Sequence, residues 1–215
     1  MPHLTTLTVG GAPAPWEALG LTARNGSLSF AGVTVVCAGG DPGIHSWHLC
    51  VEPGSTVRVG ETLIDGIATT ISAGDAPADG DTSIGSQRVV GVDHVVITTD
   101  DLDRTCAAIE SGLGVEVRRE RDAGDGVAQR FFKLDNTIVE VVTGPHVTSA
   151  SASLWGFVVS VDDLFELAEE LGVDVTSAPK RATQPGRYIS TARSAVGLGV
   201  PFAMMTPHVP GMPTR

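Results

Sequence analysis

The strongest constraint on the fold is an order of secondary-structure elements that occurs twice after Val89. A strand containing VDHVVIT is followed by a helix predicted at 101–112 and then by three strands, VEVRRER, AQRFFKL and NTIVEVV. The strand LWGFVVS, a helix predicted at 163–171 and three further strand-like runs ending in VPFAMMTP repeat this order. A unit of this size cannot bury its apolar face alone, so the two copies are expected to pack against each other.

Both helices carry start and stop signals. Asp100 or Asp101 can cap the first helix, which the segment GLG ends. Asp162 or Asp163 can cap the second, and Gly172 ends it. A carboxylate before the first turn accepts a backbone N–H that has no partner within the helix, and glycine tolerates the left-handed conformation after the last turn. The sequence therefore predicts two helices in equivalent places, one in each unit.

The N-terminal region carries a weaker copy of the same pattern. PHLTTLTVG resembles VDHVVITTD, SLSFAGVTVVCAGG resembles RFFKLDNTIVEVVTG, and HSWHLCV resembles SLWGFVV. The alignments pair the following residues: His3 with His94, Val36 with Glu140, and Trp47 with Trp155. We therefore predict a degenerate copy at 1–71 and a more regular paired domain at 89–210. The segment 72–88 is rich in Gly, Ala, Asp and Ser without periodicity, which predicts a linker.

Composition excludes several classes of function. The chain is 42% hydrophobic and 18% charged, which is typical of a compact globular protein. A formal net charge of −11 disfavours nucleic acid and anionic membranes as partners, and the densest basic stretch, VRRERD, carries acids of its own. No apolar run approaches the roughly 20 residues of a membrane span, and the first residues lack the pattern of a secretory signal. We expect a cytoplasmic protein, and a homodimer is left open.

Two strands each carry one metal-capable side chain at their centre, His94 and Glu140. Glu140 shares a strand face with Ile138 and Val142, so its carboxylate either meets solvent or is buried and needs a partner. His94 is either a polar residue at a strand end or a histidine that hydrogen-bonds inside the sheet. The functional alternative to these structural roles is that both side chains face one cleft and form part of a binding site.

The segment from VDHVVITTDDLDRTCAAIESGLGVEVRRER to FFKLDNTIVEVVTGP resembles the modules of the glyoxalase/bleomycin resistance/dioxygenase superfamily, also called the vicinal oxygen chelate superfamily. The resemblance rests on DHVVI in the first strand, DLD at the helix start, GLG after the helix and EVV in the last strand. It covers residues 89–207 well and 3–71 weakly. It implies an α+β fold of paired βαβββ modules, with curved mixed sheets around a cleft and helices outside. Such a fold does not name a substrate.

The resemblance also implies a metal site. Members of the superfamily hold a cation with side chains from the first and last strands of each module, and the cation stabilises a substrate oxyanion as a Lewis acid. His94 and Glu140 match these positions in the first module, which implies ligand roles for both and a catalytic role for Glu140.

The second module departs from this pattern. It offers Trp155, Gly156 and Phe157 on its first strand, and Met204 and Met205 on its last. Thioethers are poor ligands for hard or borderline cations. The standard metal set is therefore incomplete.

One further residue would complete the set. The alignment of Trp47 with Trp155 places His48 where Gly156 stands. If the N-terminal half packed against the first module, His48, His94 and Glu140 would form a set of two histidines and one carboxylate, which suits Fe(II) or a similar ion. The cofactor is then one divalent metal, Fe, Zn, Mn or Ni, and otherwise none.

Cations and aromatic rings would hold a ligand in a cleft without a metal. Arg187 and Arg193 flank YISTA, and an arginine can bind a carboxylate through two parallel hydrogen bonds. Trp155, Phe132 and Tyr188 are the aromatic candidates for the cleft wall, although such rings commonly belong to a core.

The sequence thus favours a glyoxalase-like protein that binds a small, anionic organic molecule. The alternative is a metal-dependent lyase, isomerase or dioxygenase that acts on vicinal oxygens.

Overall fold

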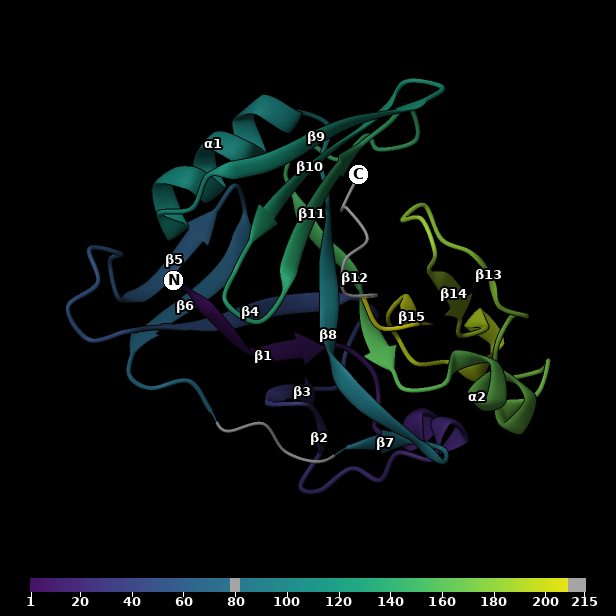
Figure 1. The fold of residues 1–215 in the computed structure, drawn as a ribbon. Helices are drawn as coiled ribbons and strands as arrows, with labels where there is room; N and C mark the ends of the chain where they lie inside the picture. The colour runs from purple at the N-terminus through teal and green to yellow at the C-terminus, as the bar shows by residue number, and fades with distance from the viewer. Residues whose placement is uncertain (78–81, 209–215) are drawn as a thin grey trace.

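Two mixed β-sheets form the molecule and share one buried core (Figure 1). The computed structural model describes residues 1–77 and 82–208. These described residues contain two α-helices, two short 3-10 helices and fifteen strands, so the α+β class predicted from the sequence is confirmed. In the part of the chain that the structure describes, no helix has both the length and the apolar composition needed to cross a membrane.

The N-terminal residues form a six-stranded sheet with the order β2-β3-β1-β4-β6-β5. Its strands are β1 (His3–Val9), β2 (Ser27–Phe30), β3 (Val33–Cys37), β4 (Ile44–Val51), β5 (Gly60–Ile64) and β6 (Ile67–Ala73). The 3-10 helix η1 (Ala14–Leu19) connects β1 to β2.

The remaining residues form a nine-stranded sheet with the order β13-β14-β15-β12-β8-β11-β10-β9, in which β7 pairs with β8. Its strands are β7 (Ser83–Ile84), β8 (Gln87–Thr98), β9 (Val117–Gly124), β10 (Val127–Lys133), β11 (Ile138–Thr143), β12 (Ser153–Val161), β13 (Lys180–Arg181), β14 (Tyr188–Thr191) and β15 (Phe202–Met205). The helices are α1 (Leu102–Leu113), α2 (Leu164–Leu171) and the 3-10 helix η2 (Ser194–Val196).

The nine-stranded sheet consists of two βαβββ modules. The elements β8-α1-β9-β10-β11 form the first and β12-α2-β13-β14-β15 form the second. In each module the first strand pairs in parallel with the last, and β8 and β12 join the modules in antiparallel fashion. Asp101 caps α1 and Asp163 caps α2, and Gly114 and Gly172 end them. The predicted repeat and both helices are therefore confirmed, with α1 shifted by one residue.

The six-stranded sheet repeats the same pairing pattern in shorter form. Strand β1 pairs in parallel with β3, β4 pairs in parallel with β6, and β1 and β4 are antiparallel. Val36 lies beside Thr8 as Glu140 lies beside Val96, so Val36 takes the place of Glu140. The same register puts Thr6, and not His3, at the place of His94, which corrects that part of the alignment.

The predicted segment boundaries differ in detail from the observed strands. Strand β6 continues to Ala73 and β8 begins at Gln87, so both ends of the predicted linker 72–88 lie in strands. Residues 78–81 of that linker and residues 209–210 of the predicted paired domain lie outside the described residues.

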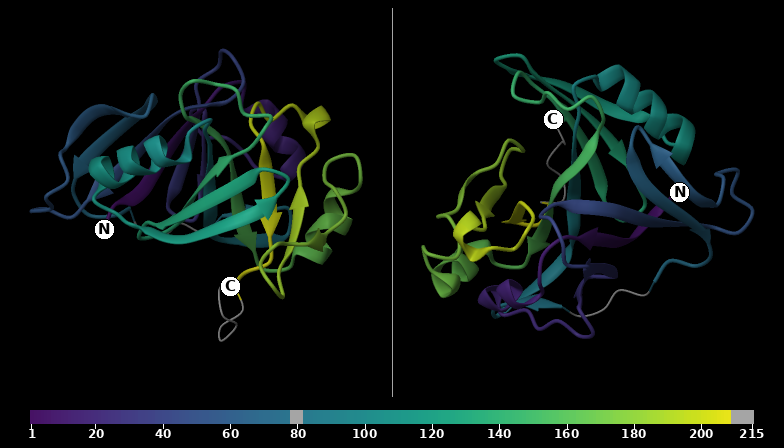
Figure 2. Two further views of the ribbon diagram at one scale, coloured as in Figure 1. Left: turned by 90° about the horizontal axis from the view of Figure 1, so that it is seen from above. Right: turned by 180° about the vertical axis from the view of Figure 1, so that it is seen from behind.

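A cluster of four aromatic rings joins the two sheets. Trp16 and Phe30 come from the N-terminal part and contact Phe157 and Phe202 of the second module, with ring centroids 5.0–6.2 Å apart. The rings are at most 2% exposed. The six-stranded sheet therefore packs on the nine-stranded sheet, with β4 against β12 and β5 against α1 (Figure 2). The opposite face of the nine-stranded sheet remains available for a site.

A three-glycine contact ties the sheets together at another point. The Gly10 N–H donates to the Gly43 carbonyl at 2.8 Å, and the Gly43 N–H donates to the Gly199 carbonyl at 2.7 Å. A Cβ atom added to Gly10 would lie 1.7 Å from the Asp41 carbonyl oxygen. The backbone at Gly10 therefore lies so close to that of Asp41 that only glycine fits.

Asp65 connects the turn between β5 and β6 to the first module. Its carboxylate accepts hydrogen bonds from Arg104 Nε at 2.8 Å and Thr105 Oγ1 at 2.5 Å, both on α1. Its carbonyl accepts from the Ala152 N–H at 3.1 Å. Burial alone would raise the pKa of Asp65, but the hydrogen bonds from Arg104 and Thr105 outweigh it and hold the pKa below its ordinary value.

We expect Asp65→Asn to lower the free energy of unfolding by about 1–2 kcal/mol at pH 7, because an anionic acceptor of two hydrogen bonds is lost while Arg104 stays partly solvated. A carboxyl group whose pKa is lowered on folding stabilises the fold above its unfolded pKa of about 3.9 and loses this contribution as the pH falls further. Urea unfolding should therefore show a difference that shrinks below about pH 4. Asp162→Asn, which breaks the exposed pair with Arg88, is the control and should change little. A constant difference from pH 7 to pH 3 would contradict the prediction.

Candidate ligand-binding cleft

The curved nine-stranded sheet carries two adjoining cavities on one face. The first has a volume of about 950 Å³ and the second of about 690 Å³. Four residues line both cavities: His94, Glu140, Ile189 and Thr191. We call the first cavity the basic compartment and the second the apolar compartment, after the side chains described below.

A β-bulge places Asp93 beside His94. In β8, His94 pairs with Val158 and Val92 pairs with Val159, so Asp93 is an extra residue without a partner. Neighbouring residues of a regular strand point to opposite faces, whereas a bulge redirects one of them. His94 Nδ1 donates to Asp93 Oδ1 at 2.8 Å, and this contact fixes the imidazole so that Nε2 faces Glu140.

Glu140 meets His94 across the parallel strands β8 and β11. Its Oε2 lies 3.5 Å from His94 Nε2, and its Oε1 accepts a hydrogen bond from Gln129 Nε2 at 2.6 Å. Gln129 in turn accepts from Arg121 Nη1 at 3.2 Å. Burial raises the pKa of Glu140, and the positive charges of His94 and Arg121 offset the increase only in part. The carboxyl group is therefore a stronger proton acceptor than a solvated glutamate.

Arg187 lines neither cavity and supports His94 indirectly, through Asp93. Its side chain is 4% exposed and pairs with Asp93 Oδ2, while the Thr206 carbonyl accepts from Nε at 2.9 Å and from Nη2 at 2.7 Å. Ser160 Oγ also donates to Asp93 Oδ2, at 3.0 Å. Burial alone would raise the pKa of Asp93, but the hydrogen bonds from His94 and Arg187 hold it far below its ordinary value. Asp93 is therefore an anion that orients His94.

The basic compartment collects an unusual share of the positive charge. Six of the fourteen Lys and Arg residues line it: Arg118, Arg119, Arg121, Lys133, Lys180 and Arg181. Glu140 is the one carboxylate among its described lining residues. Within residues 1–77 and 82–208, none of the six cations forms an ion pair. Their charge is therefore available to a ligand.

The apolar compartment contains an exposed indole. In β12, Leu154 pairs with Ile97 and Gly156 with Val96, so Trp155 is the extra residue of a second bulge. Its side chain lines the compartment and is 53% exposed. The bulge therefore turns an aromatic ring out of the core and toward the cavity.

The other predicted binding residues lie elsewhere. Arg187 does not line either cavity, because it serves as the buried partner of Asp93. Arg193 is exposed and donates to the Val173 carbonyl at 3.2 Å. Tyr188 packs against Phe165 of α2, with ring centroids 4.9 Å apart. Phe132 borders the basic compartment, but its side chain is completely buried.

The predicted third metal ligand, His48, does not lie beside His94 and Glu140. His48 lies in β4 of the six-stranded sheet, where its Nε2 is 3.0 Å from Ser72 Oγ, and it lines neither compartment. It occupies the strand face opposite to the buried Trp47, away from the core. Although the N-terminal half contacts the first module through Asp65, His48 therefore does not meet His94 and Glu140.

The donors at the junction make only half of a metal site. Two ligand atoms about 2.1 Å from one tetrahedral ion lie about 3.4 Å apart, which is close to the 3.5 Å between His94 Nε2 and Glu140 Oε2. Among the described residues, however, no three His, Cys, Asp or Glu side chains form a group that could hold an ion. Asp93 is the nearest further carboxylate, and Arg187 and His94 already engage it. The residues do not fit the complete standard set.

Sequence reasoning missed the residues that organise this site. Gln129 faces Glu140 because it lies on the neighbouring strand, and Ser160 reaches Asp93 over a separation of 67 residues. The basic segment VRRERD was noted in the sequence but discounted because it also carries acidic residues. Its three arginines nevertheless all line one cavity. The strand alternation of β9 was the signal that could have found Arg119 and Arg121.

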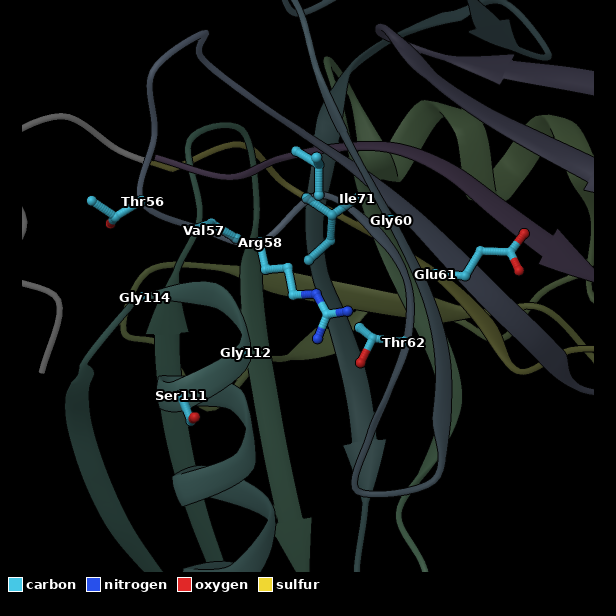
Figure 3. Close-up of a pocket in the computed structure, with 11 residues that line it drawn as sticks. Thr56, Val57, Arg58, Gly60, Glu61, Thr62, Ile71, Ser111, Gly112 and Gly114 are labelled. Carbon is cyan, nitrogen blue, oxygen red and sulfur yellow. The ribbon is translucent and has the colours of Figure 1, made fainter.

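A third cavity, of about 300 Å³, lies between the loop before β5 and the end of α1 (Figure 3). Arg58 and Glu61 are its charged lining residues among those described, and none of the predicted site residues lines it. It is separate from the cleft.

The fold and the cleft place the described residues in the class of proteins built from paired βαβββ modules. Residues 91–194 match the family model of the Glyoxalase/Bleomycin resistance protein/Dioxygenase superfamily. The resemblance noted in the sequence is therefore confirmed over these residues. No curated protein matches the chain.

Several solved structures are similar to this chain. Methylmalonyl-CoA epimerase from Mycobacterium tuberculosis has 17% identity and a TM-score of 0.47, covering 56% of this chain and 90% of its own. A variant of the Streptomyces coelicolor methylmalonyl-CoA epimerase, in complex with 2-nitronate-propionyl-CoA, has 16% identity and a TM-score of 0.48, covering 56% and 99%. A hypothetical protein from Bacillus halodurans has 12% identity and a TM-score of 0.48, covering 57% and 97%. These values carry no argument about function.

Proposed function

We propose that the protein binds a small organic anion in the basic compartment, next to His94 and Glu140. The observation that carries this proposal is the set of six lining cations, none of which forms an ion pair within the described residues, in a chain whose net charge is −11. Repulsion among these six like charges makes such a concentration costly unless an anionic ligand compensates it. A volume of about 950 Å³ suits a small organic molecule better than an inorganic ion alone.

The walls of the compartment support the same ligand class. Arg119 and Arg121 come from β9, and Lys180 and Arg181 come from β13, at the opposite edge of the sheet. Phe131, with Arg119 5.5 Å from its ring centroid, and Met205 supply apolar surface between them. A ligand between the two edges would meet cations from both modules. Charge-assisted hydrogen bonds to a carboxylate or phosphate are stronger than neutral ones.

Calorimetric titration with benzoate and with the neutral benzamide tests the proposal. We expect benzoate to bind and benzamide not to bind. Arg121→Gln and Arg181→Gln should each weaken benzoate roughly tenfold or more, because each removes a charged donor. Arg24→Gln, which neutralises an exposed arginine outside both compartments, is the matched control and should leave the affinity unchanged.

Two results would overturn the proposal. One is equal binding of benzoate and benzamide by the parent protein. The other is an equal affinity for benzoate in Arg121→Gln, Arg181→Gln and the parent, since the lining cations would then play no role.

A metal-dependent lyase, isomerase or dioxygenase is the second candidate, and the 3.5 Å approach of His94 to Glu140 favours it. In that case substrate oxygens or water would have to supply the other ligands. Elemental analysis of protein purified without chelators should then find about one Fe, Zn, Mn or Ni per chain, and His94→Ala should lose it. Metal-free parent protein that binds benzoate supports the binding protein instead. The cytoplasmic location stays a prediction.

A further inference from the structure

We propose that the ligand is amphipathic, with an anionic group in the basic compartment and an apolar, flat part against Trp155 in the apolar compartment. The inference rests on the proposed function and extends it to a chemical class. It also places the middle of the ligand beside His94 and Glu140, since both residues line both compartments.

The two compartments differ sharply in chemistry. No Lys or Arg is among the described residues that line the apolar compartment, whereas six line its neighbour. Its surface comes mainly from apolar side chains, among them Val96, Val142, Trp155, Val158 and Ala203. One end of a ligand that spans both compartments would therefore contact cations, and the other end would contact apolar side chains.

Trp155 is the residue that indicates a flat apolar group. The other two tryptophans, Trp16 and Trp47, are at most 1% exposed, whereas Trp155 is 53% exposed. Its exposure follows from the bulge in β12, which interrupts the regular pairing with β8. Bulges next to binding sites commonly redirect a side chain. An indole offers a large rigid face on which an aromatic or planar group can stack.

The junction between the compartments fixes where the two parts of the ligand meet. Glu140 and His94 come from adjacent parallel strands at the middle of the sheet. Ile189 and Thr191 come from β14, next to the β13 edge of the sheet, and line both compartments as well. The combined space exceeds what a small carboxylate needs. A short anion would therefore fill the basic compartment alone, and a longer one with an apolar tail would cross the junction.

Two carboxylates of equal charge, propionate and 4-phenylbutyrate, test this inference by titration calorimetry. We expect the parent protein to bind 4-phenylbutyrate about tenfold or more tightly than propionate, because the phenyl group loses its contact with water. In Trp155→Ala most of this difference should disappear, while the affinity for propionate stays unchanged. Phe165→Ala, which removes an exposed aromatic ring of α2 outside the compartments, is the matched control and should keep the difference.

Tryptophan fluorescence gives a second measurement on the same titration. Because Trp155 is the exposed tryptophan of the three, 4-phenylbutyrate should shift the parent emission to the blue and propionate should not. The Trp155→Phe variant should show no shift while it still binds the ligand in calorimetry.

The outcomes separate the inference from the proposed function. Equal affinities for the two carboxylates in the parent, or a difference that survives in Trp155→Ala, would overturn the amphipathic ligand and leave anion binding intact. Binding of neither carboxylate, or equal binding of 4-phenylbutyramide, would overturn both.

Discussion

Replacing Arg187 with Ala is expected to lower the free energy of unfolding by about 3–5 kcal/mol, which is typical when one partner of a buried ion pair is removed. The Asp93 carboxylate would then remain buried without its counter-charge, since Arg187 is its one cationic partner besides His94 among the described residues. The Thr206 carbonyl would also lose its two donors. Urea unfolding followed by circular dichroism measures the loss.

Arg193→Ala is the matched control for this prediction. The sequence assigned both arginines to ligand binding, but Arg193 is exposed and its guanidinium contacts one backbone carbonyl. Its removal should change stability by no more than about 0.5 kcal/mol. The double variant Arg187→Ala/Asp93→Asn should recover part of the loss, because the uncompensated charge is gone. A loss in Arg187→Ala as small as that in Arg193→Ala would contradict the assigned role.

Gly10→Ala is expected to cost about 3 kcal/mol or more, at or beyond the upper end of ordinary overpacking. The added Cβ would lie 1.7 Å from the Asp41 carbonyl oxygen and 2.7 Å from the carbonyl carbon, and backbone atoms cannot rotate away as a side chain can. The loop would have to move, and this would disturb the Gly10–Gly43 hydrogen bond and the Gly43–Gly199 bond that joins the sheets.

Gly74→Ala is the control for that substitution, because an added Cβ there meets nothing within 4 Å and φ is not positive. It should change the unfolding midpoint little in thermal and urea melts. Equal midpoints for the two alanine variants would show that the contact at Gly10 relaxes without cost.

The fold was predictable from the sequence because its main signals are local. Helix caps such as Asp101 and Asp163, and the order of apolar strands, depend on neighbouring residues only. The alignment of Val36 with Glu140 was correct for the same reason, but that of His3 with His94 was wrong, because the register of β1 with β3 puts Thr6 at the equivalent position. Such a register between strands leaves no clear trace in the alternation of apolar residues.

The site was predictable only in part. The approach of His94 to Glu140 follows from their places on the first and last strands of one module, and their role as metal ligands stays a prediction. The carboxylate partner of Arg187, Asp93, lies 94 residues away, so no local pattern indicates that this arginine is buried and supports the site. The bulges at Asp93 and Trp155 arise from the pairing of β8 with β12, which the sequence of either strand alone does not fix.

The bond between Asp93 and Arg187 crosses the boundary between the two modules, and so does the bond between Asp93 and Ser160. The first module contributes His94, Glu140 and the Asp93 carboxylate that orients the imidazole, but the second contributes the charge and the hydroxyl that hold Asp93. A fragment with the first module alone would carry His94 and Glu140 and still lack the two groups that position Asp93. If evolution or design exchanges one module for that of a relative, the residues on both sides of these contacts would therefore have to be transferred together. Any ligand held at the junction would stabilise the docking of the two modules as well as its own binding site.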